Sequence, residues 1–219
     1  MNDKLAETDE KGLPPSPRWK GARSLRLAHE LNSRCIDLLC DLAARPSVEG
    51  LPVMLRANRN LWYRLDPEAR WRLAAFPFVI VDFRFRDEAW WRGRGSVENH
   101  AVAECPAGDA LPLESRESLL LETMMFAWQV AREDQRVAQI LFAMTQPVAR
   151  LVSSLAMQEI RTLAIDRSTP LRVRWEYNAQ LWRELLLAAA TEDEEALEEV
   201  RLHAKLLFCG DLISLGSES

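Results

Sequence analysis

The stretch that decides the fold is LWYRLDPEARWRLAAFPFVIVDFRF, residues 61–85, together with a divergent copy, LVSSLAMQEIRTLAIDRSTPLRVRW, at residues 151–175. A shift of 90 positions aligns the two stretches without a gap. The same shift aligns residues 25–91 with 115–181 and gives 10 identical pairs among 67. The identities are Arg26/Arg116, Leu31/Leu121, Leu51/Leu141, Met54/Met144, Leu61/Leu151, Leu65/Leu155, Leu73/Leu163, Ala74/Ala164, Arg84/Arg174 and Ala89/Ala179. Because the same order of local patterns occurs in both halves, the sequence predicts a tandem repeat.

Each copy ends in a short stretch in which apolar residues alternate with other residues. The apolar positions are Val79, Val81, Phe83 and Phe85 in the first copy and Leu171, Val173 and Trp175 in the second. Such alternation is typical of a strand that is buried on one face. A lone strand of this length is marginal. The sequence therefore predicts that residues 79–85 and 171–175 lie side by side as an antiparallel ribbon across an approximate twofold axis.

Helical periodicity surrounds both strand-like stretches. The predicted helices cover 24–45, 51–63, 67–75, 115–142, 147–165, 178–190 and a last helix from about 192. Ser24, Asp66 and Thr191 are the predicted N-caps, Pro67 takes the first position of its helix, and Gly210 is the predicted stop. The predicted fold class is therefore mainly α, with two tandem similar helical halves that form a pseudo-dimer, each with one short strand-like segment.

The predicted organisation has five parts. Residues 1–23 form a disordered arm, because prolines and charges leave little to bury. The first repeat is 24–92, the linker is 93–114, the second repeat with an extra C-terminal helix pair is 115–210, and the tail is 211–219. We expect the extra helix pair to have no counterpart in the first half, where the linker occupies that place.

Charge and composition limit the class of function. The chain of 219 residues has a formal net charge of −5, whereas a nucleic-acid binder that works alone usually has a basic excess. No apolar stretch reaches the length of a membrane span, and the charged, proline-rich N-terminus lacks an apolar signal core. We therefore expect a cytoplasmic protein with no membrane contact, whose cysteines, Cys35, Cys40, Cys105 and Cys209, are reduced.

The sequence contains no recognisable catalytic or metal-binding motif. There is no glycine-rich phosphate loop and no metalloprotease histidine pair, and the three histidines lie far apart. Cys35 and Cys40 stand five positions apart on one predicted helix and lack the spacing of a zinc site. We predict a protein that is not an enzyme, with no catalytic residues, no metal and no cofactor.

Two groups of side chains are candidates for a partner or nucleic-acid surface. They are the arginines Arg84, Arg86, Arg172 and Arg174 and the tryptophans Trp90, Trp91 and Trp182. The arginines could instead form a solvated sheet face with ion pairs to Asp82, Asp87, Glu88 and Glu176. The tryptophans could instead fill the core, since large aromatic side chains supply much of the buried area of a protein.

The layout of the second half resembles that of the D subunit of the flagellar master transcriptional activator (FlhD-type). A first helix leads into ILFAMTQPVARLVSSLAMQEIRTLA at 140–164, then an apolar–basic alternation that ends in LRVRW at 171–175. NAQLWRELLL at 178–187 and a capped last helix follow. The resemblance covers about 120–208, and the first half is similar over 25–86, with LPVMLRANRNLWYRLDPEARWRLAAFPFVIVDFRF at 51–85.

The resemblance implies a mainly helical, dimer-like regulator that works with a zinc-containing C-type partner subunit. The family's intersubunit cysteine is not matched, because Phe83 and Val173 occupy its neighbourhood. A tandem fusion makes that link unnecessary. We expect a transcriptional regulator or co-activator subunit that reaches DNA only through its protein partner, with higher oligomers left open.

Two other functions are compatible with the sequence. The chain could be a cytoplasmic protein–protein adaptor or chaperone-like module without DNA binding. It could also be a small-molecule-binding helical domain in which the tryptophans line a pocket.

Overall fold

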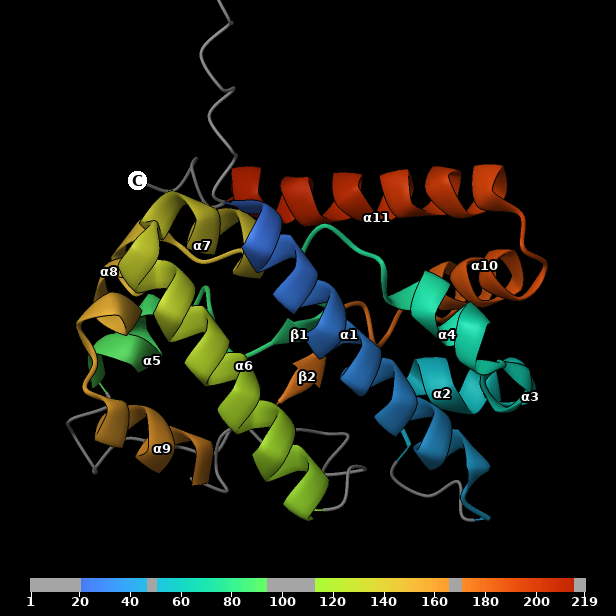
Figure 1. The fold of residues 1–219 in the computed structure, drawn as a ribbon, viewed down its shortest axis with the longest axis horizontal. Helices are drawn as coiled ribbons and strands as arrows, with labels where there is room; N and C mark the ends of the chain where they lie inside the picture. Colours follow the sequence, from blue (N-terminus) through green and yellow to red (C-terminus); the bar gives the residue numbers. More distant parts are fainter. Residues whose placement is uncertain (1–20, 47–50, 94–112, 166–170, 215–219) are drawn as a thin grey trace, which may run out of the picture.

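The fold is mainly α-helical, as predicted. The computed structural model describes residues 21–46, 51–93, 113–165 and 171–214, which form eleven helices and one two-stranded sheet (Figure 1). No helix within these ranges is both long enough and apolar enough to cross a membrane. Most of the predicted arm at 1–23 and of the predicted linker at 93–114 lies outside the described residues.

The two halves share part of their order of elements: each begins with a long helix and later contains a helix, a short strand and another helix, whereas α8 stands at the place of both α2 and α3. The first half contains α1 (Gly21–Ala44), α2 (Val53–Ala57), α3 (Arg59–Arg64), α4 (Pro67–Ala74), β1 (Val81–Asp82) and α5 (Glu88–Gly93). The second contains α6 (Leu113–Glu133), α7 (Gln135–Phe142), α8 (Gln146–Ser154), α9 (Met157–Ile165), β2 (Arg172–Val173), α10 (Ala179–Ala190) and α11 (Glu194–Ser214). Helix α5 stands at the place where α10 begins, which the prediction leaves without a helix, and the place of the rest of the C-terminal helix pair falls largely on residues 94–112, outside the described residues.

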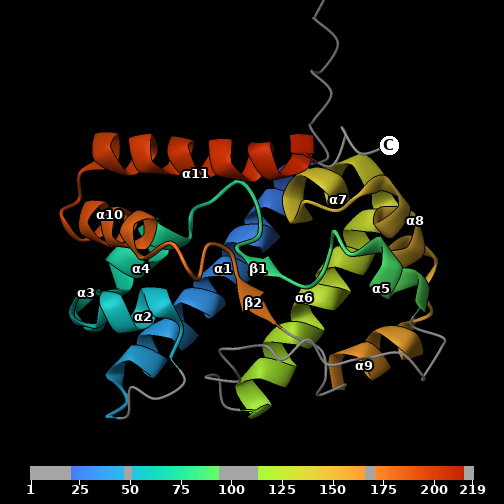
Figure 2. The same cartoon turned by 180° about the vertical axis from the view of Figure 1, so that it is seen from behind.

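The predicted strand pairing is confirmed. Strands β1 and β2 are antiparallel, with Val81 opposite Val173 and Asp82 opposite Arg172. The ribbon lies in the middle of the molecule, close to the long helices α1 and α6 (Figures 1 and 2). Ile80 is completely buried although the alternation placed it on the exposed face. The first-half stretch crosses the core, so both of its faces are covered at this point.

Each strand leads into a helix that packs on the other half of the chain. After β1, helix α5 packs on α8 of the second half, and after β2, helix α10 packs on α2, α3 and α4 of the first half (Figure 1). The Asn58 side chain, between α2 and α3, donates a hydrogen bond to the carbonyl of Ala179 at the start of α10 (2.8 Å). Buried side chains of both halves form one continuous core. The two predicted repeats therefore share one core.

Two equivalent hydrogen bonds hold these exchanged arms. The Met54 N–H donates to the Glu176 carbonyl (3.1 Å), and the Thr145 N–H donates to the Phe85 carbonyl (3.3 Å). Thr145 lies 91 residues after Met54, and Glu176 lies 91 residues after Phe85. The first half therefore supplies the donor in one bond and the acceptor in the other. Such an interchange is what a twofold relation between the halves requires.

The same shift of 91 relates the caps that follow the strands. The Asp87 side chain accepts a hydrogen bond from the Trp90 N–H (2.9 Å), as Asn178 does from the Leu181 N–H (3.0 Å). Helices α4 and α9, in contrast, begin 90 residues apart. Helix α9 is one residue longer than α4, so their ends and the strands that follow are 91 residues apart, and six residues separate each helix from its strand.

Several predicted helix ends are confirmed, and others are wrong. Asp66 caps α4, with its side chain accepting from the Ala69 N–H (2.7 Å), and Pro67 begins that helix. The predicted helices at 51–63 and 115–142 each divide in two, at Asn58 and at Asp134. At Asp134 the side chain accepts from backbone N–H groups of α7, so it starts a new helix and ends the previous one.

Three predicted helix ends are in the wrong place. Helix α1 begins at Gly21, so Ser24 lies inside it and is buried. The Thr191 hydroxyl donates to the Leu187 carbonyl at the end of α10, while Asp193 caps α11. Helix α11 continues through Gly210 to Ser214, so the predicted tail at 211–219 begins inside the helix.

Candidate interaction site at the strand pair

A surface groove of about 680 Å³ opens beside the ribbon. Asp82 and Arg86 line it from the first half, and residues 172–180 line it from the second half. The groove therefore combines side chains from both repeats. Three of the four candidate arginines, Arg86, Arg172 and Arg174, line it, and Arg84 does not.

Arg174 is a buried structural residue. Its Nε donates to the Val79 carbonyl (2.9 Å), and its Nη2 donates to the Phe142 carbonyl (2.7 Å). Its Nη2 also lies 3.6 Å from Asp82 Oδ1, and its guanidinium carbon is 5.0 Å from the centre of the Phe208 ring. These contacts join β1, α7 and α11, and the side chain is 5 % exposed. Assigning Arg174 to a partner surface is therefore wrong.

In the groove, the half-exposed Arg172 side chain lies beside the largely buried Glu176 side chain. The Arg172 side chain is 47 % exposed, and its Nε lies 3.9 Å from Glu176 Oε1. Burial raises the pKa of Glu176 above its ordinary value of 4.5, although the charge of Arg172 and a hydrogen bond from Tyr177 act in the opposite direction. The groove thus contains a carboxylate that ionises less readily than a free glutamate.

The raised pKa of Glu176 leads to a pH-dependent prediction. A carboxyl group whose pKa is higher in the folded state stabilises the fold below the unfolded pKa, and this stabilisation is lost as the pH rises through the folded pKa. We therefore expect Glu176→Gln to increase the free energy of unfolding modestly at pH 7.5 and to leave it unchanged at pH 3.5. Urea unfolding at both values measures this, with exposed Glu195→Gln as the control. A variant that is less stable than the parent at pH 7.5 would show that the ion pair with Arg172 outweighs burial.

Arg84 lies outside the groove and pairs locally. Its backbone has a φ of 44°, and its Nη1 lies 3.1 Å from Asp87 Oδ2. Its guanidinium carbon is 5.8 Å from the centre of the Trp90 ring. Each of the four acids expected to pair with an arginine does so, in the pairs Arg174–Asp82, Arg84–Asp87, Arg172–Glu176 and, with a further arginine, Arg92–Glu88. The expected solvated face does not hold for Arg174, which is buried.

The tryptophans belong mainly to the core. Trp91 and Trp182 are buried, and the indole N–H of each donates to a carbonyl next to its own strand, that of Arg84 (2.9 Å) and that of Arg174 (3.3 Å). The half-buried Trp90 packs edge-on against Trp91 with ring centres 5.1 Å apart. Trp91 and Trp182 therefore cannot contact a partner in this structure, and placing them on a partner surface is wrong.

Asn32 is a structural residue that helical periodicity does not identify. Its amide nitrogen donates to the carbonyls of Ala74 (3.2 Å) and Phe78 (2.9 Å), and its amide oxygen accepts from the Ile80 N–H (3.0 Å). The residue is completely buried in α1. These bonds hold the chain between α4 and β1. The sequence signal is an amide on the apolar face of a helix, where a polar group needs buried partners.

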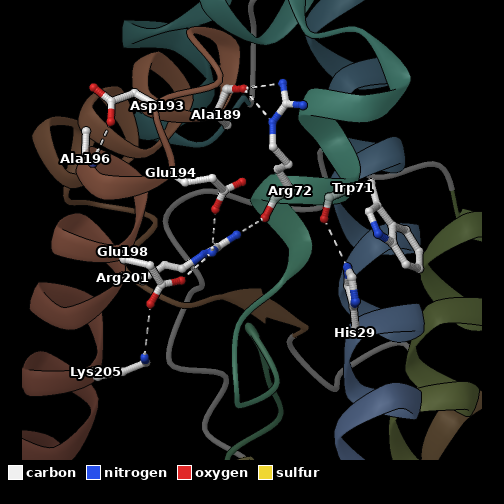
Figure 3. Close-up of polar contacts among 10 residues, drawn as sticks. All are labelled: His29, Trp71, Arg72, Ala189, Asp193, Glu194, Ala196, Glu198, Arg201 and Lys205. Carbon is white, nitrogen blue, oxygen red and sulfur yellow. Dashed lines mark hydrogen bonds and ion pairs between the residues drawn. The ribbon is translucent and has the colours of Figure 1, made fainter.

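A second polar network attaches the C-terminal helices to the first half (Figure 3). Arg72 of α4 donates through Nε (3.2 Å) and Nη2 (2.9 Å) to the Ala189 carbonyl at the end of α10. Arg201 of α11 donates to the Arg72 carbonyl and forms ion pairs with Glu198 (2.5 Å) and Glu194 (4.0 Å). Its side chain is buried, so these contacts fix the position of α11.

The described residues offer little for metal or thiol chemistry. Burial raises the pKa of Cys35 to about 12 and that of Cys40 to about 11, which keeps both thiols protonated and poorly nucleophilic. In the described ranges no group of three or more histidine, cysteine, aspartate or glutamate side chains could hold a metal ion.

Comparison with known proteins found no match to this chain. No protein-family model matches it, and neither a curated protein nor a solved structure does. The resemblance to the FlhD-type subunit therefore rests on the layout of the sequence.

Proposed function

We propose that this chain is a non-enzymatic regulatory subunit that acts on transcription through a protein partner and reaches DNA only through that partner. The observation that best supports the proposal is the exchange of strand-and-helix arms between the halves, with α5 on α8 and α10 on α2, α3 and α4. A dimeric regulator whose two copies became fused has this organisation. The resemblance to the FlhD-type subunit implies a dimer-like arrangement, and the exchange of arms agrees with it.

The pseudo-dimer is part of the same proposal. Its support is the twofold interchange in the bonds Met54–Glu176 and Thr145–Phe85 and the matching caps Asp87 and Asn178. Fused pseudo-dimers usually descend from proteins that work as dimers, in which two equivalent surfaces were present. The halves now differ, because α11 follows only the second of the two strand-and-helix arms among the described residues.

The charge distribution supports an indirect contact with DNA. The net charge is −5, and of the groove arginines Arg174 is used inside the core. A surface that neutralises several phosphates needs several available basic side chains. A basic partner would supply these side chains, and this chain would bind that partner specifically and position it in the complex.

Capture from a native lysate tests the proposal. Tagged full-length chain is expected to retain a DNA-binding regulator from cells that naturally produce it, and the groove variant Arg172→Glu is expected to retain less of that regulator. Arg84→Ala, outside the groove, is the control and should retain the parent amount. Recovery of proteins without any DNA-binding member would reject transcriptional regulation and favour the adaptor function.

A further inference from the structure

Helix α11 has an inner stripe of residues that is buried in the core. Its spacing of four, three and four positions keeps the members on one face of the helix. The inner stripe consists of Leu197, Arg201, Ala204 and Phe208. The Phe208 ring stacks on the Phe78 ring with centres 4.3 Å apart, and Arg201 belongs to the polar network with Arg72 (Figure 3). This face of α11 is therefore fully used by the fold.

A second stripe with the same spacing lies on the outer side of α11. We call it the outer stripe, and it consists of Glu195, Glu199, Leu202 and Leu206. Leu202 is 55 % exposed and Leu206 is 63 % exposed. Helix α11 lies along the edge of the molecule with the other helices on one side of it (Figures 1 and 2). The outer stripe thus presents two neighbouring leucines to solvent.

The acidic half of the outer stripe is not neutralised by the basic residues of α11. Arg201 and Lys205 both pair with Glu198, with N–O distances of 2.5 Å and 3.8 Å. Among the described residues, Glu195 and Glu199 form no ion pair, and both are exposed. The outer stripe therefore combines an apolar pair with an uncompensated negative charge over roughly 17 Å of helix.

We propose that the outer stripe of α11 docks a basic amphipathic helix of the partner protein. Apolar side chains at helical spacing would cover Leu202 and Leu206, and flanking lysines or arginines would pair with Glu195 and Glu199. The inference rests on the proposed function, to which it adds a contact surface besides the groove and the chemistry of the partner. Helix-on-helix docking of this kind uses anchors at every third or fourth residue.

Charge argues against a second copy of this chain as the occupant. Parallel packing of two outer stripes places Glu195 and Glu199 against the same acids of the other copy. Antiparallel packing in which the leucine pairs meet places Glu199 opposite Cys209 and Glu195 near the end of the helix, where the sequence has no basic residue to pair with either acid. Like charges across an interface oppose association, whereas a basic helix complements the stripe.

Binding of a model helix tests the proposal with the full chain. The probe is a fluorescein-labelled 18-residue peptide of leucine and lysine with an amphipathic helical pattern, and its twin carries glutamate in place of lysine. Fluorescence anisotropy should show binding of the lysine peptide and at least about tenfold weaker binding of the twin. The variant Leu202→Ser/Leu206→Ser should bind the lysine peptide about tenfold or more weakly than the parent, because buried apolar anchors dominate such interfaces.

Two further variants separate the contributions. The variant Glu195→Gln/Glu199→Gln should bind the lysine peptide several-fold more weakly than the parent and show a smaller salt dependence of binding. Leu121→Ser/Ile140→Ser removes exposed apolar side chains from α6 and α7 and should leave binding unchanged. Circular dichroism and urea unfolding confirm that each variant is folded. Equal binding by the parent and Leu202→Ser/Leu206→Ser, or equal binding of the two peptides, overturns the proposal.

Failure of this inference can be distinguished from failure of the proposed function. If the parent and Leu202→Ser/Leu206→Ser retain the same regulator from lysate, the function holds and the outer stripe is rejected as its docking site. If the parent retains no regulator, the function itself fails. If light scattering shows that the parent is a dimer and Leu202→Ser/Leu206→Ser a monomer, the stripe binds a second copy, which overturns the proposal of a basic partner.

Discussion

Arg174→Met is expected to lower the free energy of unfolding by about 3–5 kcal/mol, the usual cost of breaking a buried charged contact. The substitution keeps the bulk of the side chain but leaves the carbonyls of Val79 and Phe142 without their guanidinium donors. Each orphaned buried acceptor costs about 1–3 kcal/mol. The Asp82 carboxylate also loses its partner at 3.6 Å. Urea unfolding followed by circular dichroism measures the difference.

Arg172→Met is the matched control for Arg174→Met. The two arginines are separated by one residue, but Arg172 is largely exposed, and its carboxylate contact is long at 3.9 Å. We expect its substitution to change stability by about 1 kcal/mol or less. Equal effects of the two substitutions would contradict the structural role of Arg174. Tests of partner binding should therefore replace Arg172 alone, because loss of folding would explain any defect of an Arg174 variant.

Neither half of the chain is expected to fold alone. In the first-half fragment, α5 loses its contact with α8, which exposes core side chains such as Trp91. In the second-half fragment, α10 loses its contacts with α2, α3 and α4, which exposes core side chains such as Trp182. Fragments 1–103 and 104–219, each expressed alone, should lack cooperative unfolding and near-ultraviolet dichroism. Produced together, they should associate and recover both signals, since the exchanged arms bind each half to the other.

The measurement for the fragments is urea unfolding of each fragment and of the co-expressed pair. The intact chain is the control for the recovered signal. A fragment that unfolds cooperatively as a monomer would show that its repeat is an independent domain. Failure of the pair to associate would show that the covalent connection is needed for assembly.

The pairing of the strands could be predicted from the sequence, but the fate of Arg174 could not. Successive side chains point to opposite faces only where the backbone is extended. Strand β2 ends at Val173, and Trp175 adopts a φ of 56°, so the rule no longer holds at Arg174. Arg172, inside the strand, is exposed as predicted. The same pattern of residue types therefore yields one exposed and one buried arginine.

The exchange of arms could not be predicted either. Periodicity shows that Leu181, Trp182 and Leu185 form an apolar face of α10, but such a face fits any complementary helix. The choice of α2, α3 and α4 depends on the direction in which the turn after β2 points. The network of Arg72 and Arg201 arises from this long-range packing. Local caps such as Asp66 were predictable because they depend on neighbouring residues alone.

Gly210 and Thr191 carry local signals for a helix end and an N-cap that the structure does not follow. An exposed glycine in a helix costs only about 1 kcal/mol. The inner stripe of α11 is buried as far as Phe208, and this packing outweighs the small cost of a glycine two residues later. Thr191 and Asp193 both have side chains suited to an N-cap, and the end of α10 uses Thr191.

Titration of a labelled DNA duplex tests the central claim, that this chain reaches DNA through a partner, most directly. The isolated chain and its complex with the captured regulator are added separately at about 0.15 M salt, and fluorescence anisotropy reports binding. We expect no change in anisotropy with the isolated chain up to micromolar concentration and a clear increase with the complex. Tight, salt-sensitive binding of DNA by the isolated chain would contradict the account, because it would show that the arginines of this chain contact phosphate by themselves.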